Sequence, residues 1–262
     1  MRALLFDVTK CIGCGACSEA CLESNRLPAA AEPAANLGPD TFTVLKTLPQ
    51  PSGEEAYYRR LCMHCLDPAC ASVCPVGALE KTANGPVVYH EKPCLGCRYC
   101  IQACAFNVPR YEWDSLTPRV RKCTFCSERL MRGESNACAE ACPAGATMSG
   151  TREELLKEAH RRIAEAPDSY VNHVYGEREA GGTSVLVLSP IPFDKLELPL
   201  RLPAEPLPVL TFEALSKIPA MVGAGSFLLA GLWWFTRRKE EVALAEGKTN
   251  KNAVSRNRGG EK

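Results

Sequence analysis

The stretch CIGCGACSEAC, residues 11–21, decides the fold of this 262-residue chain. Its four cysteines are separated by two, two and three residues, and three similar quartets follow it, so the chain's 16 cysteines form four clusters with none left over. Each quartet begins with a C-x-x-C pair, and this internal repeat indicates metal binding and not a disulfide framework. The quartets are Cys11, Cys14, Cys17 and Cys21; Cys62, Cys65, Cys70 and Cys74; Cys94, Cys97, Cys100 and Cys104; and Cys123, Cys126, Cys138 and Cys142.

Iron-sulfur clusters explain these spacings better than zinc does. A structural zinc site uses two cysteine pairs separated by a longer loop, and only the second and fourth quartets could satisfy that pattern. The first and third quartets read C-x2-C-x2-C-x3-C, the run that places three thiolates around one face of a [4Fe-4S] cube. Proline follows the last cysteine at Cys74-Pro75 and Cys142-Pro143, as is typical of the same run.

In such a run the fourth cysteine begins a helix that leads away from the first three, so it ligates the neighbouring cluster. Cys21 is therefore predicted to leave the cluster of Cys11, Cys14 and Cys17. Four interlocked runs predict four [4Fe-4S] clusters in two pairs. The stretches between the quartets are 40, 19 and 18 residues long, so spacing alone does not decide which motifs pair.

Short strands are expected around the quartets, in ALLFDV (3–8), TFTVLKTL (41–48) and PVVYH (86–90). Thr151 and Glu154 form a T-x-x-E capping box, which predicts a helix over 151–165.

Two further stretches, YVNHVY (170–175) and TSVLVL (183–188), predict a β-hairpin whose turn contains Gly181 and Gly182. A phosphate-binding loop is the less favoured interpretation of this glycine pair.

Six prolines lie between Pro190 and Pro208, and they exclude a continuous helix. Four leucines alternate with other residues there, which predicts an extended arm that lays leucines on a surface, either of this chain or of a partner. These leucines are Leu196, Leu198, Leu200 and Leu202.

The stretch from Ile218 to Thr236 holds 19 residues without a charge. As a helix it would be about 28 Å long, close to the thickness of a bilayer's hydrocarbon core. We therefore predict a transmembrane helix, with a buried core helix as the alternative. Three basic residues follow directly at 237–239, so the positive-inside rule places the tail in the cytoplasm and the cysteine-rich part outside.

The predicted fold class is α+β. Its expected parts are two interlocked bacterial-ferredoxin-like modules (1–150, with an insert at 22–61), a helix and hairpin extension (151–189), a proline-rich arm (190–217), a single transmembrane helix (218–236) and a polar cytoplasmic tail (237–262).

The formal charge of +1 and the lack of a basic face argue against a nucleic-acid partner. Between Lys92 and Arg132, however, eight basic residues face three acids. They are expected either to balance buried, negatively charged clusters or to form a solvated loop. His64, beside Cys65, is expected to pack against a cluster, and donation of an N–H to tune the cluster's potential is the alternative.

Longer stretches resemble a known family. They are CMHCLDPACASVCPVGAL (62–79), CLGCRYCIQACAFNVPRY (94–111), CAEACPAGA (138–146) and HVYGEREAGGTSVLVL (173–188). They are similar to the iron-sulfur electron-transfer (beta) subunits of membrane-bound respiratory oxidoreductases, of the hydrogenase-2 and formate dehydrogenase types. The resemblance covers about residues 4–200 together with a C-terminal membrane anchor.

The resemblance implies that the motifs pair in a nested way, the first with the fourth and the second with the third. The implied ligand sets are Cys11, Cys14, Cys17 and Cys142; Cys21, Cys123, Cys126 and Cys138; Cys62, Cys65, Cys70 and Cys104; and Cys74, Cys94, Cys97 and Cys100.

It also implies an electron conduit. Electrons would pass between a catalytic hydrogenase or formate dehydrogenase subunit and an integral membrane cytochrome b or quinone-binding subunit. The alternative is a subunit of another molybdopterin oxidoreductase that works as a quinol-linked reductase. The N-terminus MRALLFDVTKC shows no twin-arginine leader, so export to the outer side of the cytoplasmic membrane by a partner's signal is expected.

No catalytic residue is expected in this chain. Closed sites use every cysteine, which leaves no iron open for substrate. The C-x3-C-x2-C signature of radical enzymes that use S-adenosylmethionine is absent, and no set of nucleophile, base and orienting residue is apparent.

Overall fold

The computed structural model describes residues 1–28, 34–49 and 55–246. The chain divides into two units, Met1–Leu210 and Thr211–Lys262, and each is described by itself. The first unit combines short strands with short helices around the cysteine motifs, in agreement with the predicted mixed α and β content.

A three-stranded sheet joins distant parts of the chain in the order β8-β1-β9. Strand β1 (Arg2–Asp7) pairs antiparallel with β8 (Thr147–Thr151) and parallel with β9 (Val185–Leu188). Every residue of β1 after Arg2 is buried, as expected of a central strand covered on both faces. The strand predicted at 3–8 is therefore confirmed.

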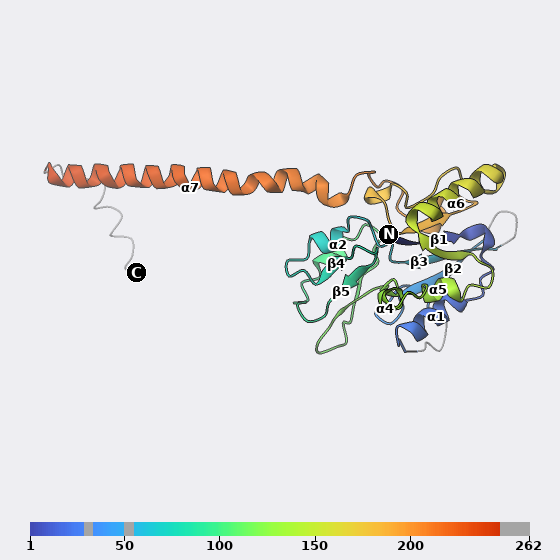
Figure 1. The fold of residues 1–262 in the computed structure, drawn as a ribbon. Coiled ribbons are helices and arrows are strands. Elements are labelled where there is room, and N and C mark those ends of the chain that lie inside the picture. The colour runs from blue at the N-terminus through green and yellow to red at the C-terminus, as the bar shows by residue number, and fades with distance from the viewer. Residues whose placement is uncertain (29–33, 50–54, 247–262) are drawn as a thin grey trace. The chain divides into compact units, whose positions relative to one another are not determined.

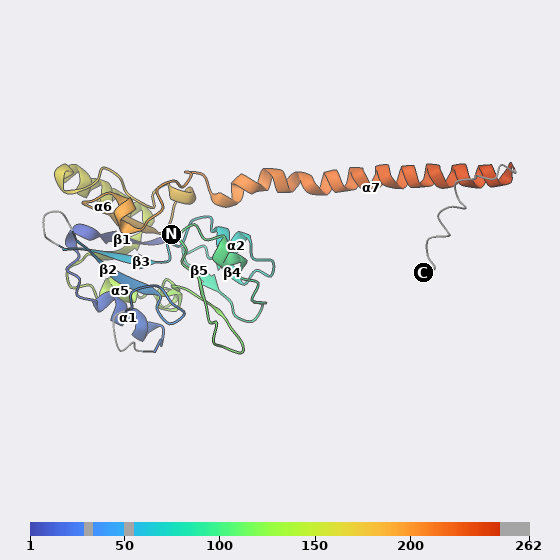
Figure 2. The same ribbon diagram turned by 180° about the vertical axis from the view of Figure 1, so that it is seen from behind.

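The two faces of β1 serve different cores. Ala3 and Leu5 pack with Leu155 and Ile163 of helix α6 (Arg152–Glu165). The alternate residues of the strand, which point to the opposite face, pack into the core that contains the cysteines. The sheet thus lies between α6 and the core that contains the cysteines (Figures 1 and 2).

Helix α6 begins as the sequence predicts. The Thr151 hydroxyl accepts from the Glu154 backbone N–H, and the Glu154 carboxylate accepts from the Thr151 backbone N–H, which completes the capping box. The helix predicted at 151–165 is confirmed.

The predicted hairpin of residues 170–175 and 183–188 is wrong. Residues 185–188 form β9, but their ladder partner is β1. Residues 170–175 form no strand, and only Tyr175 makes an isolated bridge, to Val187. The parallel pairing with β1 buries all four residues of β9, a gain that a local hairpin at the surface does not offer. The short 3-10 helix η3 (Glu179–Gly181) occupies the expected turn.

Three two-stranded ladders complete the strands. Strand β2 (Thr43–Pro49) confirms the strand predicted in the insert, and β5 (Val87–Tyr89) confirms the one predicted at 86–90. Their antiparallel partners are β3 (Glu55–Leu61) and β4 (Leu79–Lys81), and the third ladder joins β6 (Arg110–Tyr111) to β7 (Val120–Arg121).

Short helices accompany the cysteine motifs. They are α1 (Ala16–Ser24), α2 (Ala69–Ser72), α3 (Tyr99–Gln102), α4 (Ser127–Met131) and α5 (Ala137–Glu140), with 3-10 helices η1 (Val8–Lys10), η2 (Pro167–Ser169) and η4 (Phe193–Leu196) elsewhere. Helix α1 packs against α5, and α2 packs against α3. In Figures 1 and 2, α1 and α5 gather at one end of the unit and α2, β4 and β5 at the other.

The proline-rich arm lies on the chain's own core. Leu196 is fully buried in η4, and Leu198 and Leu202 pack against the same core, whereas Leu200 is exposed. Most of the alternating leucines therefore cover this domain, and Leu200 alone of the four points to solvent.

Helix α7 (Leu207–Ala245) contains the predicted membrane-spanning stretch, but it begins at Leu207 and not at Ile218. Among the described residues it is the one helix long and apolar enough to cross a membrane, and its apolar span is not buried by the protein. Large side chains such as Phe227, Trp233 and Trp234 are mostly exposed along it. The predicted polar tail is helical to Ala245, and residues 247–262 lie outside the described residues.

Candidate metal centres

All four motifs use the same local geometry. In each, the third cysteine lies on a short helix and the fourth follows four residues later, about one helical turn away. The pairs are Cys17 and Cys21 on α1, Cys70 on α2 with Cys74, Cys100 on α3 with Cys104, and Cys138 on α5 with Cys142. Because α1 packs on α5 and α2 on α3, the helices of the first and fourth motifs meet, as do those of the second and third.

Two small cavities are lined by four cysteines each. One is bordered by the group that we call the first set, Cys11, Cys14, Cys17 and Cys142. The other is bordered by the fourth set, Cys74, Cys94, Cys97 and Cys100. Each cavity therefore draws three cysteines from one motif and one cysteine from another, far away in sequence.

The other eight cysteines group through their mutual electrostatic influence. Burial is the largest cause of their raised pKa values, and the charge of Cys138 raises the pKa of three thiols further. These are Cys21, Cys123 and Cys126, and with Cys138 they are the group that the family resemblance implies and that we call the second set. In the same way, after burial, Cys62 raises the pKa of Cys65, Cys70 and Cys104, and these four form the third set.

Neighbouring sets also influence one another, in a fixed order. In addition to burial, Cys138 of the second set raises the pKa of Cys17 in the first. Cys62 of the third set raises the pKa of Cys123 in the second. Cys100 of the fourth set does the same to Cys70 in the third. These influences link the first set to the second, the second to the third and the third to the fourth.

Burial makes most of these thiols weak acids. It raises the pKa of Cys21 and Cys70 to about 12 each and that of Cys100 to about 11. A neutral thiol is a poor ligand, so metal binding at these positions releases protons.

Cys74 differs from the other cysteines. Burial raises its pKa, but backbone N–H groups, first that of Val76 and then those of Leu79, Ala78 and Gly77, more than offset this and lower it. The Ala78 N–H donates to the Cys74 sulfur at 3.1 Å. A thiolate at this position is held by a cradle of amides at the start of the loop that leads to β4.

Arg59 on β3 is a buried cation, only 6% exposed. Its side chain donates to the hydroxyls of Thr43 at 2.8 Å and Thr147 at 3.1 Å, and within the described part of the chain it forms no ion pair with a carboxylate. Burial alone would lower its pKa, but the Cys138 and Cys17 thiolates outweigh burial and raise it. Cys138 and Cys17 are thus the groups that favour the charged form of Arg59.

Two lysines are likewise cations removed from solvent near cysteine thiols, here those of the third set. Lys122 is 5% exposed, and its ammonium donates to the carbonyls of Val87 and, at 3.0 Å, of Cys123. Lys81 is half-buried and donates to the His64 carbonyl at 3.1 Å. Burial lowers the pKa of Lys81 to about 8, although Cys65 acts in the opposite direction.

These buried cations fit negatively charged clusters. A [4Fe-4S] centre with four thiolates carries a net negative charge, and a buried cation is costly unless it is paired. Of the eight basic residues between Lys92 and Arg132, Lys122 is the one that is buried. Lys92, Arg98 and Arg132 are exposed, as the solvated-loop interpretation expects, and the other four are half-buried. Arg59 and Lys81 were not singled out by the sequence, because nothing in an alternating strand marks which charge points inward.

A single metal ion fits less well. Among the described residues, no three His, Cys, Asp or Glu side chains come close enough together to hold one ion. Each thiolate of a cubane binds a different iron atom, so its ligands stand around a larger centre than the tetrahedral zinc ion does.

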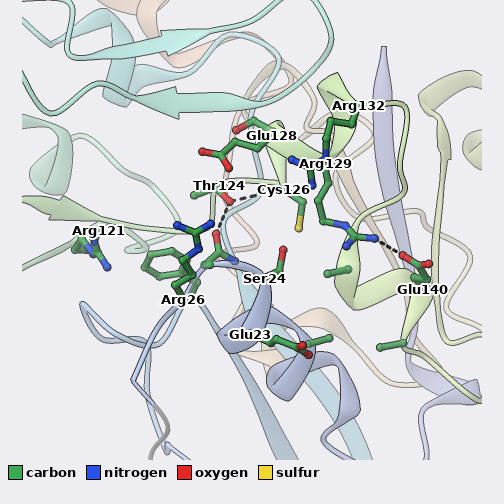
Figure 3. Close-up of a pocket in the computed structure, with 16 residues that line it drawn as sticks. Glu23, Ser24, Arg26, Arg121, Thr124, Cys126, Glu128, Arg129, Arg132 and Glu140 are labelled. Carbon is green, nitrogen blue, oxygen red and sulfur yellow. Dashed lines mark hydrogen bonds and ion pairs between the residues drawn. The ribbon is translucent and has the colours of Figure 1, made fainter.

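A cavity of about 720 Å³ borders the second set. Figure 3 shows the Cys126 sulfur between the side chains of Ser24 and Arg129 at this cavity. Burial raises the pKa of Cys126, and both Ser24 and Arg129 act against that effect. Most of the arginines around it have partners, such as Arg129 with Glu140.

The C-x-x-C loops share one backbone conformation but differ in the residue that adopts it. The residue before the second cysteine has a left-handed backbone in all four motifs, with φ of 73° at Gly13, 47° at His64, 71° at Gly96 and 57° at Phe125. Glycine adopts this conformation freely, whereas histidine and phenylalanine do not. The rings of His64 and Phe125 pack together, with centroids 4.6 Å apart.

Comparison with protein families agrees with the cysteine pattern. Residues 10–78 and residues 54–152 each match a model described as a 4Fe-4S dicluster domain. Together the two matches cover all four motifs, so 4Fe-4S clusters are the cofactors of this chain.

Similar proteins are found among electron-transfer subunits. Hydrogenase-2 operon protein HybA of Escherichia coli O157:H7 is 39% identical over 75% of this chain and 72% of its own length. The iron-sulfur subunit of the nitrate-inducible formate dehydrogenase of Escherichia coli K12 is 38% identical over 70% of this chain and 66% of its own length. A protein of Nitratidesulfovibrio vulgaris (strain Hildenborough) is 39% identical over 97% of this chain and 72% of its own length.

Proposed function

The chain belongs to the family of iron-sulfur electron-transfer subunits that includes hydrogenase-2 operon protein HybA and the formate dehydrogenase iron-sulfur subunits, and we propose that it works as a four-cluster conduit. It is a non-catalytic subunit of an oxidoreductase complex. The clusters supply the one-electron chemistry, and the chain supplies their ligands, their order and their electrostatic surroundings. The single observation that carries this proposal is the succession of four cysteine sets, each built from two motifs.

Each set would ligate one [4Fe-4S] cluster. The cavity linings support this assignment for the first and fourth sets, and the mutual pKa influences support it for the second and third. The contacts of α1 with α5 and of α2 with α3 support the interlocking of the first motif with the fourth and of the second with the third. Arg59 and Lys122 would balance the cluster charge inside the protein.

Electrons would enter and leave at the two ends of the row. The first residue inside the C-x-x-C loop is exposed at both end motifs, where Ile12 is 62% and Leu95 is 61% exposed. At the second motif the corresponding residue, Met63, is 4% exposed. An exposed apolar side chain directly beside a cluster brings a redox partner to the shortest distance from it.

One partner would be a catalytic subunit of the hydrogenase or formate dehydrogenase type, and the other an integral membrane cytochrome b or quinone-binding subunit. Helix α7 would anchor the chain in the membrane, with the basic residues Arg237, Arg238 and Lys239 on the cytoplasmic side and the clusters outside. Removal of residues 211–262 should release the protein from membranes and leave its cluster spectra unchanged. Continued membrane binding of this shortened chain would contradict the role of α7.

Metal analysis of the anaerobically purified complex tests the conduit. Four clusters require about sixteen iron atoms per chain, and reduction should give electron paramagnetic resonance signals from four centres. Far fewer iron atoms after full reconstitution would contradict the proposal. Nickel in the same complex would identify a hydrogenase partner, and molybdenum or tungsten a formate dehydrogenase partner.

A further inference from the structure

The His64 side chain is fully buried and has one polar atom without a partner. The Val87 backbone N–H donates to His64 Nδ1 at 2.9 Å, so Nδ1 is an acceptor and carries no proton. A neutral imidazole must then carry its proton on Nε2. In the described part of the chain, Nε2 has no hydrogen-bond partner of ordinary geometry. Burial lowers the pKa of His64, and the Cys123 backbone carbonyl, which is its nearby weak acceptor, acts in the opposite direction.

An orphaned N–H donor in the interior of a protein calls for an acceptor, since its desolvation costs about 1–3 kcal/mol. The surroundings of His64 offer cysteine sulfur from two sets. Cys65, of the third set, is its neighbour in the chain, and the ring packs on Phe125, which lies between Cys123 and Cys126 of the second set. His64 therefore stands where the second and third sets meet.

The backbone adds an independent reason to assign a role to this side chain. The equivalent loop position holds glycine in the first and third motifs, and glycine suits the left-handed backbone. A histidine at φ of 47° costs about 1–2 kcal/mol relative to glycine. Histidine therefore occupies a position where glycine would be less strained.

We propose that His64 Nε2–H donates a hydrogen bond to a sulfur atom of an inner cluster, held by the second or the third set, and thereby raises the potential of that cluster. A hydrogen bond to cluster sulfur stabilises the reduced, more negative state, and such bonds are among the factors that set cluster potentials. The inference rests on the proposed function, because it requires clusters at these two sets. His64 is a positioning and tuning residue, since the cluster and not the imidazole carries the electron.

Potentiometric titration of the membrane complex, followed by electron paramagnetic resonance, tests the proposal. His64→Leu should shift the midpoint potential of one inner cluster to a lower value and leave the other three unchanged at full iron content. His64→Asn, which retains an N–H donor and tolerates the left-handed backbone, should shift it less. His160→Leu removes a half-exposed imidazole on α6 that pairs with Glu177, so as the matched control it should leave the four potentials at their wild-type values.

Unchanged potentials in a fully loaded His64→Leu complex would overturn the proposal. If that variant does not load its clusters, the wild-type complex decides. The chain has four histidines, and only His64 is buried. Pulsed resonance on protein labelled with ¹⁵N-histidine should detect coupling of that nitrogen to a reduced inner cluster, and absence of the coupling would overturn the proposal. Failure of the conduit itself would appear separately, as missing iron in the wild-type protein.

Discussion

The outer and inner cysteine motifs use the same loop in opposite ways. The outer loops, which begin at Cys11 and Cys94, hold glycine at the left-handed position and expose the apolar residue before it. The inner loops, which begin at Cys62 and Cys123, hold His64 and Phe125 there and bury both rings. The difference supports the proposal that redox partners approach the outer motifs, whereas the inner loops are covered by their own side chains.

In the outer loops, tyrosine side chains from neighbouring strands occupy the space next to the two glycines. A Cβ atom added at Gly13 would lie 2.6 Å from the Tyr57 ring, and one at Gly96 would lie 2.6 Å from the Tyr111 hydroxyl. Neighbouring strands therefore cover the backbone at the ends, and the two inner loops cover each other.

The largest effect is expected from a cysteine that the first motif would lend to the middle of the row. Cys21→Ser should remove one inner cluster, about four of the sixteen iron atoms, and spare the cluster of the first set. Iron analysis and electron paramagnetic resonance measure the loss. Cys14→Ser is the matched control, since it should remove the outer cluster, and identical spectra for the two variants would mean that each motif keeps its own cluster.

The next effect concerns the buried charge between the first and second sets. Arg59→Met should destabilise the loaded protein by about 3–5 kcal/mol, because cluster charge loses a buried counter-ion. The adjacent Arg60 pairs with the half-exposed Glu197, so Arg60→Met should cost less than about 1 kcal/mol. Anaerobic unfolding monitored by cluster absorbance compares the two, and equal losses would contradict a special role for Arg59.

A third test compares equivalent apolar residues of an inner and an outer loop. Met63→Ala should cost about 2–5 kcal/mol, since this side chain is buried in the core. Ile12→Ala should change stability by no more than about 0.5 kcal/mol because Ile12 is exposed. If Ile12→Ala is as damaging to the isolated subunit as Met63→Ala, the outer loop is not an open surface.

The smallest expected difference lies within one outer motif. Gly13 and Gly15 both have positive φ, of 73° and 78°, but only a Cβ at Gly13 meets Tyr57. Gly15→Ala should cost about 1–2 kcal/mol, and Gly13→Ala about 1 kcal/mol more. Thermal unfolding of both variants separates the cost of the left-handed backbone from the cost of the contact with Tyr57. Equal losses of stability would show that the Tyr57 side chain moves aside without cost.

Local patterns in the sequence were sufficient to locate several elements, whether their partners are near in the chain or far away. The capping box of Thr151 and Glu154 and the runs at 3–8 and 86–90 are examples, and all three elements are present. The strand at 185–188 was found but given the wrong partner, because its ladder partner β1 lies about 180 residues earlier in the chain. Strand β3 was missed, since its sequence AYYRRL places Arg59 toward the interior and so lacks a regular polar alternation.

For the candidate site, too, some residues could be predicted from the sequence and others could not. The spacing of the motifs pointed to all 16 cysteines, and the family resemblance implied a nested pairing. That pairing stays a prediction, and the cavities lined by the first and fourth sets support it. The side chains around the clusters were harder to foresee. The free Nε2 of His64 exists only because Val87, in another ladder, occupies Nδ1.

The sheet β8-β1-β9 also determines how early in synthesis the first unit can complete its fold. Its first strand ends at Asp7 and its last at Leu188, so 188 − 7 = 181 residues must be made before the sheet closes. At ribosomal speeds of about 5–20 residues per second this takes roughly 10–40 s. The proposed first set also waits for Cys142, so Cys11, Cys14 and Cys17 are expected to stay reduced for much of this time, whereas the proposed third and fourth sets are complete once Cys104 is made.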